Sequence, residues 1–257
     1  MIIDAHVHLI HEADDLVPDA LGSRQNAEDL LPMMKQHGVV AALVFGNPFY
    51  WDPAPENTLA AAAAKKYPDT LIPVGMVNPR FGEAAIAEMR RCVGQLGCRA
   101  IKMRPDSSAT AANAPSMRAI ADEAAALGVP LLVHTGRSHW AHPLAVSDLA
   151  KDHPKTQVVM QHMFDIHGKY ALKAAIENPN LLLETSGCLG VPFIKEVVET
   201  IGSDRVMFGS DIPALSLGLE IEKIRRANLP SKDEHNVLYG TAARLWGLGL
   251  TRERAVR

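Results

Sequence analysis

The chain has 257 residues, a length that suits one (β/α)8 barrel of about 250 residues and is long for a single β-sandwich. Its hydrophobic content of 47% and charged content of 21% argue against a disordered chain, and no apolar run reaches the ~18 residues that a membrane span requires. A net charge of −3 argues against nucleic acid as a partner, since a polyanion is bound by a basic surface.

The cysteines indicate a reducing compartment. Cys92, Cys98 and Cys188 are an odd number, and their spacings fit neither a zinc finger nor a disulfide framework. No N-terminal stretch combines the basic, apolar and small-residue segments of a signal peptide. We therefore expect a cytoplasmic protein with one domain over residues 1–257 and no membrane contact.

Strands and helices alternate along the chain. Short apolar runs predict buried strands, and amphipathic segments bounded by Pro or Gly predict helices; Gly38, for example, ends the first helix. The predicted strands are 1–8, 39–45, 71–77, 99–104, 130–134, 157–161, 181–185 and 206–209. The predicted helices are 26–37, 58–67, 83–96, 115–127, 143–152, 166–177, 192–201 and 217–226, with a closing helix over 233–245.

Eight strands that are each followed by a helix predict parallel βαβ units and an α/β fold closed as a single (β/α)8 TIM barrel. An open doubly wound sheet is the alternative, but no G-x-G-x-x-G follows any predicted strand. Two loops stand out, one over 10–23 and one over 46–57 that carries Phe49, Tyr50 and Trp51. The aromatic cluster suits packing or a dimer contact in a homo-oligomer, with a substrate wall as the alternative.

Polar residues stand where the predicted strands end, which is where barrels of this kind build their active sites. His6 and His8 are two residues apart on the first strand, so they point to the same face and form half of a metal site. Further polar residues follow at other strand ends: Lys102, Arg104, His134, His162, Glu184, Ser186 and Asp211. Four histidines and an aspartate at one mouth make a nitrogen and oxygen ligand set for a divalent metal.

Six segments, IIDAHVH, RAIKMRP, VPLLVHTG, VMQHMF, RVMFGSDIP and YGTAARLWGL, resemble the signature segments of the amidohydrolase-related (amidohydrolase 2) branch of the amidohydrolase superfamily. The resemblance covers essentially the whole chain. It implies a distorted (β/α)8 barrel with one or two divalent metals, zinc first and manganese or iron as alternatives, bound through His6, His8, His134 and Asp211. Thr241 stands where the family usually has asparagine, and we expect it to cap a helix.

The resemblance also assigns chemistry. A divalent metal with an open position lowers the pKa of bound water from about 15.7 toward about 7. Asp211 would take the proton of that water and pass it to the leaving group. His162 would either bind a second metal or polarise the substrate carbonyl. Lys102 would be carboxylated and bridge two metals in a binuclear site, or remain an ordinary lysine paired with an acid.

Residues just beyond the fourth and fifth strands are candidates for substrate binding. Arg104 and Arg137 suit bidentate hydrogen bonds to a substrate carboxylate, and Trp140, after His139, suits the wall of an apolar pocket. Ordinary surface ion pairing is the alternative. Three further residues, Asp4, Asp165 and His167, are candidates for orienting ligands from behind, and Asp4 would otherwise pin its strand.

These observations predict a metal-dependent hydrolase that cleaves a C–O or C–N bond next to a carbonyl in a small, carboxylated substrate. The alternative from the same branch is a nonoxidative decarboxylase or hydratase of an aromatic or muconate-like acid. A metal-free binding barrel is a third hypothesis, which the intact ligand set argues against.

Overall fold

The computed structural model describes residues 1–11, 24–163 and 167–249. The predicted loop over 10–23 therefore lies mostly outside the described residues, as does the start of the helix predicted over 166–177. Within the described part of the chain, no helix is both long and apolar enough to cross a membrane.

Parallel strands follow one another in chain order and form two adjoining sheets. The strands are β1 (Ile2–His8), β2 (Val39–Phe45), β3 (Leu71–Pro73), β4 (Gly75–Met76), β5 (Ile101–Met103), β6 (Leu131–His134), β7 (Val158–Gln161), β8 (Leu181–Glu184) and β9 (Val206–Met207). The strand predicted over 71–77 is divided at Val74. The Val74 N–H donates to Val44 O over 2.9 Å, whereas the Gly75 N–H donates to Ala100 O over 3.0 Å, so the chain changes partner at this point.

Backbone hydrogen bonds join the segment after β9 to β1. The Ala5 N–H donates to Phe208 O over 3.0 Å, and the Asp211 N–H donates to His6 O over 2.8 Å. Asp4 strengthens this seam, since its Oδ1 accepts from the N–H of His6 at 3.1 Å and from the N–H of Ser210 at 2.9 Å. The strands thus close into a ring, and the predicted (β/α)8 barrel is confirmed.

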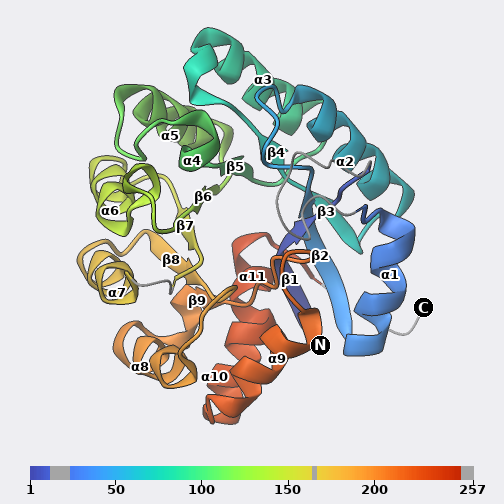
Figure 1. Cartoon of the computed structure of the whole chain (residues 1–257), viewed down its shortest axis with the longest axis vertical. Helices are drawn as coiled ribbons and strands as arrows, with labels where there is room; N and C mark the ends of the chain where they lie inside the picture. Colours follow the sequence, from blue (N-terminus) through green and yellow to red (C-terminus); the bar gives the residue numbers. More distant parts are fainter. Residues whose placement is uncertain (12–23, 164–166, 250–257) are drawn as a thin grey trace.

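Helices surround the strands, and the last of them lies near the centre of the view, where Ala242 packs with the residues that fill the barrel interior (Figure 1). The helices are α1 (Ala27–His37), α2 (Ala54–Lys66), α3 (Glu83–Gly94), α4 (Pro105–Ser108), α5 (Pro115–Leu127), α6 (Pro143–Asp152), α7 (Gly168–Glu177), α8 (Val191–Ile201), α9 (Leu217–Arg226), α10 (Ser231–His235) and α11 (Thr241–Leu245). At the start of α1, Asn26 and Asp29 form a capping box, and Gly38 ends this helix with a φ of 72°, as the sequence predicted.

Two of the predicted helices are present but differ from the prediction in one detail each. The second helix begins at Ala54 rather than at residue 58, because prolines are tolerated in a first turn, where backbone N–H groups lack helical partners. The closing helix contains a π-helical turn over Asn236–Gly240, and Thr241 continues it with helical φ and ψ of −67° and −47°. Thr241 is therefore not a cap. Its buried hydroxyl donates to Ser203 O over 2.9 Å.

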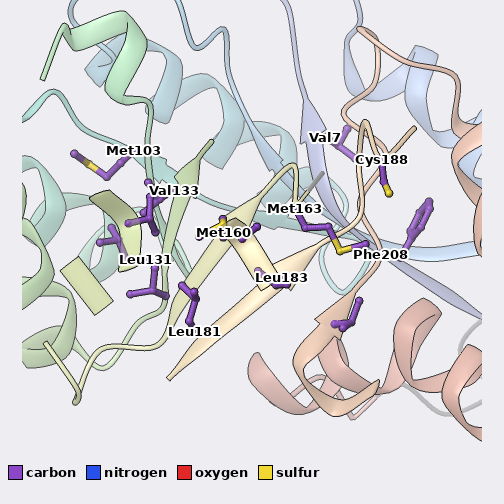
Figure 2. Packing of buried hydrophobic residues seen from close by; sticks show 14 of the residues in the cluster. Val7, Met103, Leu131, Val133, Met160, Met163, Leu181, Leu183, Cys188 and Phe208 are labelled. Atoms are coloured by element: carbon purple, nitrogen blue, oxygen red, sulfur yellow. The ribbon is translucent and has the colours of Figure 1, made fainter. Parts of the chain in front are cut away.

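The hydrophobic core has two layers because successive strand residues point to opposite faces. Residues such as Leu131, Val133, Leu181 and Leu183 face outward and pack under the helices (Figure 2). The residues between them, including Leu132 and Leu182, fill the barrel interior. The three cysteines are buried and free, which agrees with the absence of a disulfide framework.

Candidate metal centre

The first strand carries two histidines into the barrel. Val7 and Leu9 pack in the outer layer, so His6 and His8, which alternate with them, point inward. The two rings lie 5.3 Å apart between centroids, and each residue is 1% exposed. Their Nε2 atoms lie 3.0 and 3.1 Å from the same atom, Oδ1 of Asp211. The structure thus brings both histidines and the aspartate together, as the sequence predicted.

Asp211 follows β9 with a φ of 57°, a left-handed conformation that short polar side chains tolerate better than most. Its second oxygen, Oδ2, lies 3.9 Å from His162 Nε2. Burial by itself raises the pKa of the Asp211 carboxyl. The charges of His6 and His162 and the hydrogen bonds from His6 and His8 outweigh that effect and hold the pKa well below its usual range. Asp211 is therefore a carboxylate at neutral pH.

His162 follows β7 with a φ of 62°. Its Nδ1 lies 2.9 Å from Ser186 Oγ, and its ring centroid lies 4.9 Å from that of His6. Burial lowers the pKa of His162 well below its ordinary value, and the attraction of Asp211 only partly opposes this effect. One ligand atom each from His6, His162 and Asp211 lie within 4.8 Å of one another, a spacing that a single metal ion could bridge.

His134 ends β6 and lies beside this cluster, with its ring centroid 4.8 Å from that of His162. Its Nε2 lies 3.2 Å from Asp106 Oδ2, and its buried Nδ1 has no hydrogen-bond partner among the described residues. Burial and then the neighbouring cations Arg104 and Lys102 lower its pKa well below the ordinary value. A buried, unprotonated nitrogen without a partner is costly unless a ligand takes it. The donor set therefore fits a divalent metal.

Two groups hold the first-strand histidines from behind. Glu184 is fully buried, and its Oε2 lies 3.0 Å from His6 Nδ1 and accepts from Ser186 Oγ at 2.8 Å. Burial by itself raises the pKa of Glu184. The hydrogen bond and the charge of His6 outweigh that effect and lower the pKa below its ordinary value, so the group is ionised. His8 Nδ1 similarly lies 3.1 Å from Gly46 O. These contacts direct Nε2 of both rings toward Asp211. In the sequence, Glu184 stands at a predicted strand end with no role assigned to it. An acid in the apolar strand LLLETSG indicates a buried carboxylate that needs a partner, and this signal could have predicted a contact with a histidine.

Lys102 lies outside the donor cluster. Its Nζ donates to Gln161 Oε1 and sits 5.1 Å from the centroid of the Phe45 ring. Burial, followed by the charge of Arg104, lowers the pKa of Lys102 to about 7, although the negative charge of Asp211 opposes the shift. The hypothesis of a carboxylated, metal-bridging Lys102 therefore gains no geometric support.

The other predicted residues have surroundings of their own in the structure. Arg104 is largely buried, with Cζ 4.4 Å from the Phe49 ring centroid. Arg137 is exposed and Trp140 half-buried, with its ring 4.3 Å from that of His139. His167 contacts the rings of His142 and Tyr170 at 4.4 and 6.0 Å between centroids. Asp165 lies outside the described residues, and Asp4 pins its strand, as described above.

The sequence matches the Amidohydrolase family model, of the amidohydrolase 2 type, over residues 3–248. The chain belongs to the amidohydrolase family. The resemblance of its strand-end segments to that family is thereby confirmed, and the family is one of enzymes that use divalent metals. No curated protein matches this amidohydrolase in sequence.

Solved structures share the barrel of this amidohydrolase. A 2,6-dihydroxybenzoate decarboxylase from Rhizobium is 18% identical, with a TM-score of 0.77 over 96% of this chain and 98% of that chain. A dihydroxybenzoic acid decarboxylase from Polaromonas sp. JS666, with bound manganese and the inhibitor 2-nitroresorcinol, is 18% identical, with a TM-score of 0.75 over 98% of both chains. A probable 2-pyrone-4,6-dicarboxylic acid hydrolase from Acinetobacter baumannii, with bound citric acid, is 14% identical, with a TM-score of 0.73 over 96% of this chain and 99% of that chain. At these identities the likeness concerns the fold.

Proposed function

We propose that this amidohydrolase is a metal-dependent hydrolase that cleaves a C–O or C–N bond next to a carbonyl in a small, carboxylated ring compound. The metal ligands would be His6, His8, His134 and Asp211, with His162 on the same centre. Nitrogen and carboxylate donors suit zinc, our first choice, and also manganese or iron. Because Lys102 is engaged by Gln161 and Phe45, we propose one metal ion rather than two.

The arrangement of Asp211 carries this proposal. Its Oδ1 lies 3.0 and 3.1 Å from Nε2 of His6 and His8, so with a metal bound this oxygen would be a ligand beside the two nitrogens, while Oδ2 is 3.9 Å from His162 Nε2, beyond hydrogen-bond distance. An ionised carboxylate with one oxygen anchored and the other available is suited to accept a proton from water and to return it to a leaving group. Hydrolysis requires both transfers.

In this proposal the metal and His162 act on the substrate carbonyl, and Glu184 orients a metal ligand. A bound divalent metal would act as a Lewis acid toward the substrate carbonyl and would lower the pKa of a nearby water. His162, unprotonated and held at Nδ1 by Ser186, presents Nε2 to the centre, where it can bind the metal or contact the substrate carbonyl group. Glu184 keeps the His6 ring in one orientation throughout.

A second candidate is a metal-dependent nonoxidative decarboxylase of an aromatic acid. The observation that favours it is the fold shared with the two dihydroxybenzoate decarboxylases, one of which holds manganese. The same ligand set serves either reaction, so the products distinguish them.

The test is product analysis on metal-stripped protein reloaded with zinc, manganese or iron. We expect ring-opened product from 2-pyrone-4,6-dicarboxylate or a related cyclic ester or amide, and no carbon dioxide from 2,6-dihydroxybenzoate. Asp211→Asn should lower kcat by at least about 10²-fold, the usual size of a lost general base, while Asp204→Asn, a change at an exposed acid, should leave it unchanged. Metal-dependent release of carbon dioxide without hydrolysis would replace the first candidate by the second.

A further inference from the structure

A cavity of about 30 Å³ lies at the mouth of the barrel, between the loop that follows β2 and the carboxyl ends of β4 and β5. Asn47 and Tyr50 contribute from the loop, Asn78 from the chain after β4, and Lys102 and Arg104 from β5 and its end. No Asp or Glu is among the described residues that line it.

Three hydrogen-bond donors in this wall are buried without a partner in the described part of the chain. They are Asn47 Nδ2, Arg104 Nε and Ser107 Oγ. Asn47 is 2% exposed, and its Oδ1 already accepts from the Phe49 N–H at 3.0 Å, so the free end of the amide is the donor. Unsatisfied buried donors are rare in folded proteins, and three around one cavity point to a ligand that accepts hydrogen bonds.

The charges of the residues that line the cavity indicate the charge of the ligand. Arg104 keeps its guanidinium in place by stacking on Phe49, and Lys102 adds N–H donors from a side chain that is 1% exposed. A wall with a fixed cation, neutral donors and no acid favours an anion over a neutral acceptor.

The size of the cavity favours a carboxylate. A water-sized group needs about 10–15 Å³ of such space, so about 30 Å³ holds two oxygen-sized groups. A carboxylate presents two oxygens, whereas phosphate and sulfate present four.

The Phe45 ring lies between Lys102, which lines the cavity, and the histidines of the candidate metal centre. The Phe45 ring has Lys102 Nζ 5.1 Å from its centroid and the rings of His8 and His6 at 4.6 and 5.3 Å. The Phe45 ring is thus a neighbour shared by Lys102 in the cavity wall and by the histidines of the centre.

We propose that this cavity binds a carboxylate of the substrate that is not the reacting group. The inference rests on the proposed function and narrows its substrate class: the molecule carries one carboxylate in the cavity and a second functional group, the one transformed, at the His6–Asp211 centre. Asn47, Arg104 and Ser107 are then the residues that select acids over neutral analogues.

The experiment uses metal-free protein, so that a carboxylate cannot bind through a metal, and measures binding of benzoate and of neutral benzamide by isothermal titration calorimetry. We expect benzoate to bind and benzamide to bind at least 10-fold more weakly. Arg104→Met and Asn47→Asp should each weaken benzoate binding by about 10-fold or more, since each removes a donor to a charged acceptor. Asn47→Asp keeps the oxygen that accepts from Phe49 and replaces the free donor by an acceptor.

The control is Arg80→Met, which removes an exposed arginine that contacts Ser108 O and Ala109 O without lining the cavity. Equal losses in Arg80→Met and Arg104→Met, or equal affinity for benzoate and benzamide, would overturn the proposal. Thermal melts of each variant separate lost binding from lost folding, and Ser107→Ala provides a milder third variant. Failure of the proposed function is distinguishable: metal-dependent turnover would be absent while benzoate binding still depended on Arg104 and Asn47.

Discussion

Glu184 offers the sharpest test of how the candidate centre is held. Its carboxylate accepts from His6 Nδ1, which leaves Nε2 to face Asp211. Glu184→Gln keeps the size of the side chain and removes the charge. A hydrogen bond to a charged group contributes about 1.5–3 kcal/mol and a neutral one about 0.5–1.5 kcal/mol, so the change should cost roughly 1.4 kcal/mol of metal binding, about 10-fold in Kd.

The assay is competition for zinc with a chromophoric chelator, at a pH where both proteins are folded by circular dichroism. Glu220→Gln is the matched control, because Glu220 is also a buried acid but contacts Gly187 N and Lys223 instead of a histidine. We expect a weaker zinc Kd for Glu184→Gln alone. An unchanged Kd in Glu184→Gln, or an equal change in Glu220→Gln, would refute the idea that this carboxylate orients His6.

Three further predictions concern packing and charge around the same ring of strands. A Cβ on Gly209 would lie 2.3 Å from Glu184 Oε1 and 2.8 Å from His6 Cβ, so Gly209→Ala should weaken zinc binding at least as much as Glu184→Gln in the same chelator assay. Thr241→Val should lower the free energy of unfolding by about 1–2 kcal/mol in urea melts, through loss of the bond to Ser203 O, with zinc affinity unchanged; a changed affinity would show that Thr241 acts on the centre. Burial raises the pKa of Asp4 to about 7, so the folded metal-free protein binds a proton more tightly than the unfolded chain does, and stability falls as the pH rises from about 4 to about 7. Asp4→Asn, which cannot lose a proton, should flatten that fall in melts across this pH range, and an unaltered slope would contradict the assignment.

The chain of strands and helices was readable from the sequence because its signals are local. Alternation over two residues and over about 3.6 residues records which face of each element is buried, and Gly38 or the prolines mark ends within a turn. The strand-end histidines followed from the same logic, since the carboxyl ends of parallel strands meet at one mouth. His6, His8, His162 and Asp211 accordingly lie together in the structure.

The sequence predictions fail where a segment far away in the chain determines which hydrogen bonds a residue makes. The strand predicted over 71–77 is divided because Val74 and Gly75 bond to different neighbouring strands. Thr241 is held by a carbonyl 38 residues earlier in the chain, so its surroundings could not reveal whether it caps a helix. Lys102, whose role the sequence left open between a carboxylated bridge and an ordinary lysine, donates to Gln161, 59 residues away in the chain.

The family, the barrel and the residue types at its mouth can be predicted from the amino-acid sequence, because each strand carries its own pattern and its own terminal polar residue. Which of these residues touch depends on the tertiary structure. It paired Glu184 with His6 across 178 residues and gathered Asn47, Arg104 and Ser107, each with a donor that has no partner among the described residues, in the wall of one small cavity. The physical reason is that burial and hydrogen-bond satisfaction are properties of contacts between strands, and the closure of the ring fixes those contacts.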